Sequence, residues 1–560
     1  MNRLENILPQ DHRKKRVIFL LVIIAASYLF FFHNLGSYSL KEPDEGRYAE
    51  IPREMIETGD YITPHLNYVR YFEKPPLFYW MTALSFKTFG MSEWSFRLPN
   101  ALIALLCIVI TYLFVTRWFT DEVGFLSSFM AMSCFGFIAL THIVTIDMLF
   151  SSLLFISLLC FFEFYREKRP LFLYFFFITL ALAILAKGPV ALILLGATIV
   201  LFLLTEKKIS FLKEMASIKG LLIFLLFAAP WFTVVSIKEK KFFHFFFVDQ
   251  HILRFLTTKH KRSGPLYYFL PVLFGGLFPW SFFLPRALIE LWRVKELQLF
   301  FIWSAVVFAF FSVSGSKLPP YILPIFPALC IILAVFFKTA WQRFPKNPER
   351  VAYMVFFSVL AAAGIVCGFG LPDKYLGAAP DTISLLREIR GLSLGVSAVS
   401  LIILVGLAFK KIRTFGTLFY ALGIFSLSAV IALMLHTHVM DGLNTTKRLA
   451  ETINAEKKSN PVVINYDAFD ETLPFYIKGR TYLADYTGEL EMGSAYPAEK
   501  RFFLDEDEFT HLFQSNRDVW VVFKKKKLAR INELGVGEKF ALTCQDNRCV
   551  IANHKQETNK

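Results

Sequence analysis

The sequence is poor in charge and lacks a continuous basic surface. Only 19% of its 560 residues are charged, whereas 55% are hydrophobic. Water-soluble proteins seldom exceed about half apolar residues, so water is not the only solvent of this chain. The net charge of +15 comes from short basic clusters between apolar stretches rather than from one stripe, which argues against nucleic acid as a partner.

A cleavable signal peptide is also missing. The first apolar stretch, residues 17–32, follows a basic cluster but has no small-residue cleavage site after it. We therefore expect this stretch to remain as an uncleaved first transmembrane helix.

Cysteines outside the apolar stretches are limited to one pair. Five of the seven cysteines lie in apolar stretches, where cysteine behaves as a small hydrophobe. Cys544 and Cys549 lack the second pair of ligands that a zinc site needs. We predict that they form a hairpin-closing disulfide in an oxidising compartment, with two free thiols as the alternative.

Long apolar stretches are what the sequence has in abundance. Windows of roughly 18 to 20 apolar residues recur along the chain, each long enough to cross about 30 Å of hydrocarbon as a helix. We predict about thirteen transmembrane helices, at residues 17–34, 98–116, 123–141, 144–164, 171–186, 189–205, 219–237, 266–285, 298–313, 321–337, 351–371, 393–409 and 415–436.

The distribution of Lys and Arg predicts the orientation of these helices. Short loops on the side of the N-terminus are basic, which makes that side cytoplasmic by the positive-inside rule. The opposite face, periplasmic in a bacterium, then carries the loops 35–97 and 238–265 and the tail. The predicted location is a bacterial inner membrane, with the N-terminus cytoplasmic and the C-terminus periplasmic.

The predicted fold class is an all-α polytopic membrane protein with a soluble C-terminal α/β domain. We assign residues 1–439 to the transmembrane domain and 440–560 to the soluble domain. The expected elements of the tail are strands at 461–466, 481–486 and 519–523, a helix at 505–514 and a hairpin at 540–552. The composition of the tail shows no catalytic cluster.

A dense group of charges follows the first apolar stretch. Glu42, Asp44, Glu45 and Arg47 lie within six residues of one another. Charges this close to a hydrocarbon boundary are costly unless they are paired or used, so we predict a functional site. The alternative is that Asp44 only caps a helix that begins near Glu45.

The same loop contains Tyr71, Glu73 and Lys74, followed by two prolines. Proline fixes its own backbone and disfavours helix in the residue before it. Glu73 and Lys74 should therefore be presented from a stiff turn, as suits a binding site.

Single charges also stand at the ends of predicted helices. Asp147 lies near the outer end of a transmembrane hairpin, where a carboxylate is a functional candidate and a hydrogen-bonded, snorkelling side chain is the alternative. Lys187 and Lys317 lie at similar places. The alternative for these lysines is simple snorkelling.

The loop 238–265 departs from the positive-inside rule, because it carries seven Lys and Arg residues on the predicted outer face. We interpret these cations, Arg254 among them, as binding a phosphate-bearing lipid. The alternative is a solvated loop or contact with anionic headgroups. His251 is a further candidate, although a lone loop histidine is more often structural.

Together these motifs resemble those of the bacterial aminoarabinose transferases that modify lipid A, membrane glycosyltransferases of the GT-C type related to protein O-mannosyltransferases. The matching motifs are E-P-D-E-x-R-Y-A-E-I-P-R-E-M, Y-F-E-K-P-P-L, R-L-P-N, A-K-G-P and S-K-L-P-x-Y. The resemblance covers residues 17 to about 436. It implies the GT-C fold, a donor of undecaprenyl-phosphate-linked 4-amino-4-deoxy-L-arabinose, lipid A phosphate as acceptor, and no cofactor. Relatives that transfer galacturonic acid share these motifs.

The resemblance also implies which residues form the site. The catalytic candidates are Asp44, Lys74 and Asp147. The substrate-binding candidates are Arg47, Tyr71, Glu73, Lys187, His251, Arg254, Lys317 and Tyr321. No metal is required, and Glu73 and His251 are the residues that would bind one.

The chemistry of such a transfer can be argued from the residues themselves. Breaking a sugar–phosphate bond releases a phosphate whose charge grows in the transition state, so fixed cations should surround it. The candidates are Lys74, Arg47, Arg254 and the Tyr321 hydroxyl. An acceptor phosphate is already anionic and needs no strong base, whereas a hydroxyl acceptor would require Asp44 to take its proton.

Two other functions fit parts of the pattern. A protein O-mannosyltransferase shares the architecture and an acidic motif in the first loop. A secondary transporter would carry its charges near mid-membrane on interrupted, repeated helices. The charges here gather at one face and no internal repeat is evident, which favours the transferase.

Overall fold

The chain divides into two compact units. The computed structural model describes residues 13–253, 264–343, 347–369, 380–435, 441, 443–458, 460–534, 540–545 and 547–554. The helical unit comprises Met1–Leu35, Arg97–Ala378 and Thr382–His436. The mixed unit comprises Gly36–Phe96, Ala379–Asp381 and Thr437–Lys560. The segment Gly36–Phe96, which the sequence analysis placed with the transmembrane helices, thus groups with the tail, Thr437–Lys560.

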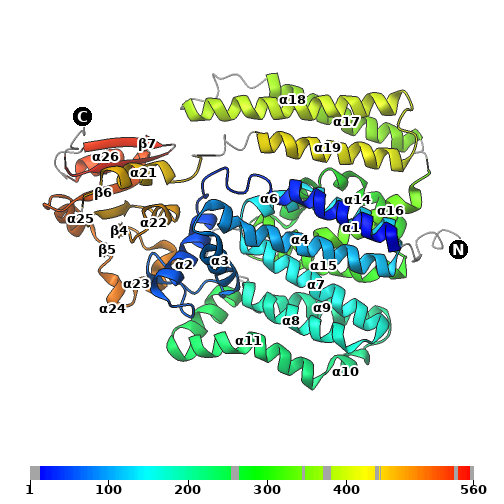
Figure 1. The fold of residues 1–560 in the computed structure, drawn as a ribbon, viewed down its shortest axis with the longest axis horizontal. Helices are drawn as coiled ribbons and strands as arrows, with labels where there is room; N and C mark the ends of the chain where they lie inside the picture. Colours follow the sequence, from blue (N-terminus) through cyan, green and yellow to red (C-terminus); the bar gives the residue numbers. More distant parts are fainter. Residues whose placement is uncertain are drawn as a thin grey trace. The chain divides into compact units, whose positions relative to one another are not determined.

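Helices of the helical unit run side by side in Figure 1, and α8 packs against α7, α9 and α11. The unit contains α1 (Arg13–Ser27), η2 (Tyr28–Phe32), α4 (Glu93–Trp118, which starts in the mixed unit), α5 (Asp121–Ser133), α6 (Phe135–His142), α7 (Ile146–Glu167), α8 (Pro170–Lys187), α9 (Val190–Thr205), α10 (Phe211–Met215), α11 (Ile218–Lys238), η3 (His244–Leu253), η4 (Leu266–Tyr268), α13 (Phe269–Gly276), η5 (Trp280–Phe283), α14 (Leu284–Leu291), η6 (Lys295–Leu297), α15 (Gln298–Val313), η7 (Pro319–Ile325), α16 (Phe326–Ala340), α17 (Asn347–Phe369), α18 (Pro380–Ala408, which starts in the mixed unit) and α19 (Phe415–Leu435).

The apolar stretches predicted from the sequence all fall on helices. Among the described residues, nine helices are long and apolar enough to cross a membrane, and two bent pairs bring the number to eleven. The predicted stretches 189–205 and 393–409 correspond to the shorter helices Val190–Thr205 and Ser393–Ala408. The chain is therefore a multi-pass membrane protein, and within the described residues the nine helices, the two bent pairs and the two shorter helices lie at the thirteen predicted stretches.

Two predicted spans are not single helices. The stretch 123–141 is bent by 54° between α5 and α6, and the stretch 266–285 belongs to a pair that is bent by 115° at a short break between α13 and α14. Pro279 lies at this break, and proline cannot donate the backbone hydrogen bond that would continue the helix. Hydropathy alone does not detect such a bend, because both arms are apolar.

The mixed unit combines short helices with two sheets. It contains α2 (Asp44–Thr58), β1 (His65–Leu66), β2 (Val69–Arg70), α3 (Leu77–Phe89), α21 (Lys447–Glu456), β3 (Val462–Tyr466), α22 (Thr472–Ile477), β4 (Tyr482–Ala484), η9 (Gly488–Leu490), α23 (Glu491–Ser494), α24 (Pro497–Lys500), β5 (Phe503–Leu504), α25 (Glu506–Phe513), β6 (Val519–Lys524), η10 (Lys525–Lys527), α26 (Leu528–Glu533), β7 (Phe540–Gln545) and β8 (Arg548–Ala552).

Six strands form the main sheet in the order β5-β4-β3-β6-β8-β7. The first four are parallel, whereas β8 and β7 are antiparallel. All five residues of β3 are buried, because α25 and α26 cover one face of the sheet and α21 and α22 cover the other. The predicted α/β tail, with its strands near 461–466 and 519–523, is confirmed.

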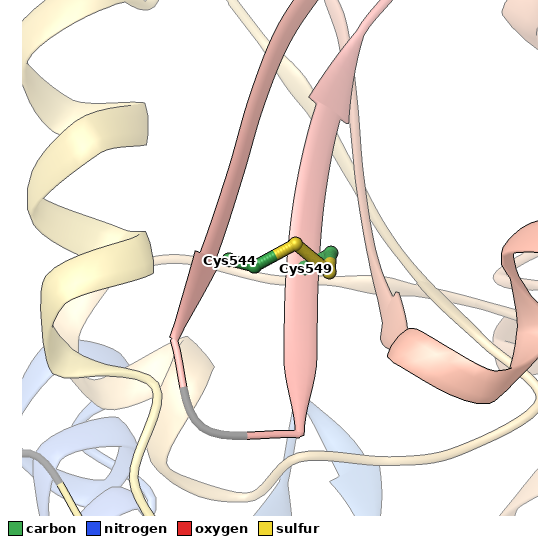
Figure 2. Close-up of a disulfide and its surroundings, with 2 residues drawn as sticks. All are labelled: Cys544 and Cys549. Atoms are coloured by element: carbon green, nitrogen blue, oxygen red, sulfur yellow. A yellow bond between two sulfur atoms is a disulfide. The ribbon is translucent and has the colours of Figure 1, made fainter. Parts of the chain in front are cut away.

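The last hairpin is closed by a disulfide. Cys544 of β7 and Cys549 of β8 are directly opposite in the antiparallel register, and their Cα atoms are 4.0 Å apart. Figure 2 shows the bond between the two strands. The pairing expected from the sequence is the one that the structure contains.

Candidate functional site

The first motif forms the start of α2. Asp44 is the first helical residue, and the side chain of the preceding Pro43 makes no capping bond. The Asp44 carboxylate instead accepts a hydrogen bond of 2.9 Å from Arg47 Nη1, one turn along the helix. Asp44 is therefore oriented by Arg47 and is not simply a helix cap.

Arg47 is buried and is bound on its other side by the tail. Its Nε donates to Glu489 Oε1 at 3.1 Å, and its Nη2 also donates to Glu489. The same Nη2 lies 3.5 Å from Glu471 Oε1. Three carboxylates therefore face the fork of N–H donors on one guanidinium.

A fourth carboxylate ties the first motif to the tail. Glu42 accepts hydrogen bonds from the backbone N–H groups of Glu471 at 2.8 Å and Thr472 at 2.9 Å, where α22 begins. Glu42 thus satisfies donors that a helix N-terminus leaves unpaired. A Cβ atom at Gly46 would lie 2.5 Å from the Thr472 nitrogen, so only glycine permits this close approach of α2 to α22.

The buried carboxylates around Arg47 have shifted pKa values. Burial raises the pKa of Glu471, and Glu42 and Glu489 raise it further. Burial also raises the pKa of Glu489, although Arg47 opposes the shift. Burial lowers the pKa of Arg47, but Glu489, Tyr71 and Glu471 outweigh it, so the arginine stays charged. The group holds protons more tightly than isolated carboxylates do.

Two buried tyrosines border this group. Burial raises the pKa of Tyr71 and of Tyr79, with the nearby Arg47 acting in the opposite direction. Within the described part of the chain, neither hydroxyl has a hydrogen-bond partner. A buried polar group without a partner is costly, so these hydroxyls are suited to meet a polar ligand.

The second motif lies outside any helix, as its prolines predict. α3 begins only at Leu77, after Pro76. Lys74 Nζ donates to the Glu73 carbonyl at 3.0 Å and lies 3.9 Å from Glu73 Oε2. Both side chains are more than four-fifths buried, at 16% and 17% exposed.

A separate group of predicted residues meets in the helical unit. Asp147 stands in the first turn of α7, where Thr145 caps the helix, and forms an ion pair with Lys187. Lys187 is the last residue of α8, which ends there because Gly188 adopts φ 101°. Its Nζ also lies 4.3 Å from the centre of the Tyr321 ring. All three residues were predicted from the sequence as site residues, but their contact was not predicted.

Lys317 is buried rather than snorkelling, at 7% exposed, and its Nζ donates to the Ser314 carbonyl at 2.7 Å.

The polar side chains of the R-L-P-N motif donate to backbone carbonyl groups of other segments. Arg97 donates to the Leu35 carbonyl at 2.7 Å, and Asn100 donates to the Leu140 carbonyl at the same distance. These bonds fix α4 to the chain that follows η2 and to α6.

Two predicted residues are not placed by the structure. Arg254 lies outside the described residues, and for His251 only its position in η3 is described. Among the described residues, no three His, Cys, Asp or Glu side chains are grouped to hold a metal ion. The roles of His251 and Arg254 stay predictions.

Sequence reasoning missed the contribution of the tail. Glu471 and Glu489 complete the surroundings of Arg47, although the tail showed no catalytic cluster. Each looks like an ordinary surface carboxylate in the sequence. Only the fold brings Glu489 within reach of a residue 442 positions earlier.

Two family models match parts of the chain. Residues 73–233 match the family described as dolichyl-phosphate-mannose-protein mannosyltransferase, and residues 449–553 match the aminoarabinose transferase C-terminal domain. A relative from Proteus mirabilis, an undecaprenyl phosphate-alpha-4-amino-4-deoxy-L-arabinose arabinosyl transferase, is 28% identical over 93% of this chain and 96% of its own. A transferase of the same description from Shewanella sediminis is 32% identical over 59% of this chain and 62% of its own.

The crystal structure of ArnT from Cupriavidus metallidurans bound to undecaprenyl phosphate matches this fold with a TM-score of 0.83. It is 25% identical and covers 96% of this chain and 98% of its own. Together the comparisons support an aminoarabinose transferase of the GT-C type. The GT-C fold and the class, a membrane glycosyltransferase, rest on the same comparisons. The family resemblance found in the motifs extends through the tail, which the motifs had left unmatched.

Proposed function

We propose that this aminoarabinose transferase moves 4-amino-4-deoxy-L-arabinose from undecaprenyl phosphate to a phosphate of lipid A. The observation that carries the proposal is the likeness, over 96% of the chain, to a transferase bound to undecaprenyl phosphate. The relatives are described by the same donor. The charged residues predicted from the sequence supply the chemistry that such a donor requires.

In the transfer, an anionic oxygen of the acceptor phosphate forms a bond to the anomeric carbon of the sugar. The bond from that carbon to the donor phosphate breaks, and its electron pair leaves with undecaprenyl phosphate. Negative charge grows on the leaving phosphate, which Lys74 and the cations of the loop 238–265, with His251 and Arg254, stabilise. No general base is needed, because the acceptor oxygen is already anionic.

The remaining predicted residues bind and orient the substrates. Asp44 orients the acceptor or the amino group of the sugar, and Arg47 holds Asp44. We assign Arg47 to Asp44 rather than to the donor phosphate, because its N–H groups already face carboxylates. Tyr71 and Glu73 face the polar part of the substrates. Asp147 keeps the catalytic role predicted from the sequence, and Lys187, Lys317 and Tyr321 keep their predicted substrate-binding roles.

Mass spectrometry of lipid A tests the function. Expression in a bacterium that lacks its own transferase but makes the donor should add an amino-pentose to lipid A, and the Asp44→Asn variant at equal expression should not. Added hexuronic acid would instead identify a galacturonic acid transferase. Mannosylated protein with unmodified lipid A would favour the protein mannosyltransferase reading, which the match of residues 73–233 makes the second candidate.

We propose that the mixed unit lies on the periplasmic side of the inner membrane, because the strongly basic short loops of the chain belong on the cytoplasmic side. In a Cys367→Ser background, which removes an exposed native thiol, Lys478→Cys should react with an impermeant maleimide in intact spheroplasts. The matched variant Lys207→Cys, also exposed, should react only after permeabilisation. Protection of position 478 in intact spheroplasts would overturn this orientation.

A further inference from the structure

The contacts of Arg47 join two distant parts of the mixed unit. On one side, Arg47 donates to Asp44 from the same helix at 2.9 Å. On the other side, it donates through Nε and Nη2 to both oxygens of Glu489 in η9 of the tail. A two-pronged bond of this kind fixes the plane of the guanidinium as well as its position.

The fixed plane determines where Nη1 points, and Nη1 is the atom that donates to Asp44. Arg47 is 7% exposed and Glu489 18% exposed, whereas the Asp44 side chain is 43% exposed. Both members of the Arg47–Glu489 pair are therefore less exposed than Asp44. The buried pair can therefore act as a fixed support for the accessible carboxylate.

A second contact holds the same helix against the tail. Glu42 accepts from the backbone of Glu471 and Thr472, and Gly46 lies so close to α22 that no side chain fits between them. The tail therefore positions Asp44, the first residue of α2, through the hydrogen bonds of Glu42 and the close approach at Gly46. Neither contact depends on Arg47.

We propose that Glu489 is a positioning residue for the transfer, which binds the Arg47 guanidinium and through it orients the Asp44 carboxylate. Glu471 assists from the same side. The C-terminal domain is thereby part of the reaction apparatus and not a passive appendage. The proposal rests on the proposed function, in which Asp44 touches substrate.

Glu489→Gln tests this role, because glutamine keeps the shape of the side chain and removes its charge. Misorientation of a reacting or orienting group by about 1 Å can lower turnover about a hundredfold. We expect kcat for transfer by the full-length protein in reconstituted membranes to fall about tenfold to a hundredfold, with the KM for the lipid-linked donor within about twofold of wild type. Glu489→Asp, which keeps the charge, should recover part of the lost turnover.

The matched control is Glu491→Gln, an exposed carboxylate two residues away in α23. It should leave both constants unchanged. Folding of every variant is checked by hydrogen exchange of the peptides that contain β3 and β6. If Glu489→Gln does not fold, Glu489→Asp carries the test, because its shorter side chain keeps the charge but changes the geometry of the bond to Arg47, and it should lower kcat with little change in KM.

Coupling between residues gives the decisive readout. If Glu489 acts through Arg47, the double variant Arg47→Lys, Glu489→Gln should lose no more turnover than the worse single variant. Wild-type kcat in folded Glu489→Gln, or losses that multiply in the double variant, would overturn the proposal. Absence of transfer by the wild-type protein would instead overturn the proposed function, which separates the two failures.

Discussion

The two groups of charges differ in their balance. In the helical unit, Asp147 pairs with Lys187, one charge against one, and both residues stand at ends of helices joined by a short chain. In the mixed unit, one guanidinium faces the carboxylates of Asp44, Glu471 and Glu489. The first group is neutral as a pair, whereas the second is negative unless it holds protons.

The difference follows from the solvent that each part of the chain requires. Helices long and apolar enough to cross a membrane tolerate a charge only when a partner neutralises it, because hydrocarbon does not stabilise ions. A unit built on a polar segment and a soluble-type sheet can keep surplus carboxylates by raising their pKa. A neutral ion pair is suited to a structural role or to exchanging its carboxylate for an anionic ligand. A group with surplus carboxylates is suited to binding an amino sugar or to retaining a proton.

The largest expected effect concerns Asp44 and Lys74, which differ in the charge that they meet. Asp44→Asn keeps the shape and removes the charge, so transfer should be abolished while donor binding stays intact. Lys74→Ala leaves the growing charge of the leaving phosphate unmatched, which typically costs about 3 kcal/mol or more, or at least about a hundredfold in turnover. It should also weaken donor binding.

Transfer to lipid A in reconstituted membranes, paired with binding of the polyprenyl-phosphate donor, measures both effects. Wild-type transfer by both folded variants would show that the motifs of the mixed unit are structural.

The balanced pair should respond differently to single and double changes. Asp147→Asn or Lys187→Met alone leaves one buried charge without a partner, at a cost of about 3 to 5 kcal/mol in stability. The double variant removes both charges and should recover most of the folded protein, measured as monodisperse yield and thermal midpoint in detergent. Its transfer activity then decides the role of the pair: activity near wild type would make it purely structural.

The disulfide of the hairpin should matter for stability and little for turnover. Closing so short a loop contributes about 2 kcal/mol by the chain-entropy estimate. Cys544→Ala with Cys549→Ala should speed hydrogen exchange in β7 and β8 and leave transfer within about twofold. Cys367→Ser, an exposed cysteine of the helical unit, is the control and should change neither. Two free thiols in protein purified without reductant would contradict the pairing.

The smallest effect is a pH dependence of the mixed unit. Burial, with Glu42, raises the pKa of Asp470 to about 6, although Arg548 and Lys524 act against it. A carboxyl whose pKa is raised on folding stabilises the folded state at low pH, and that contribution is lost as the pH rises from about 4 through about 6.

Asp470→Asn should remove this dependence, because asparagine resembles the protonated form. The difference in thermal midpoint between wild type and variant should therefore shift as the pH rises from about 5 to about 7.5. Parallel curves would contradict the shift.

Sequence patterns located the helices well because burial in hydrocarbon leaves a strong local signal. The stretch 144–164 overlaps α7 and the stretch 415–436 overlaps α19. The bend at Pro279 escaped notice, since the two arms of the bent pair are together apolar enough to be taken for one span. In the tail, alternation and turn residues were enough to locate β3 and β6.

The candidate site was predictable only where residues lie close in sequence. The Asp44 and Arg47 contact follows from their spacing of three on a helix. Asp147 and Lys187 were proposed singly, because no periodicity links residues on different helices. Glu489 left no signal, since its role depends on a fold that brings the tail onto α2.

The separation of 442 residues between Arg47 and Glu489 has a consequence for biogenesis. At roughly 5 to 20 residues per second, a ribosome completes α2 about 20 to 90 seconds before it makes η9. During that interval the segment Gly36–Phe96 waits without the strands and helices that complete its unit. A prematurely terminated chain would carry every motif of the first segment yet lack Glu489, so Arg47 gains this partner only in a chain that has been synthesised as far as η9.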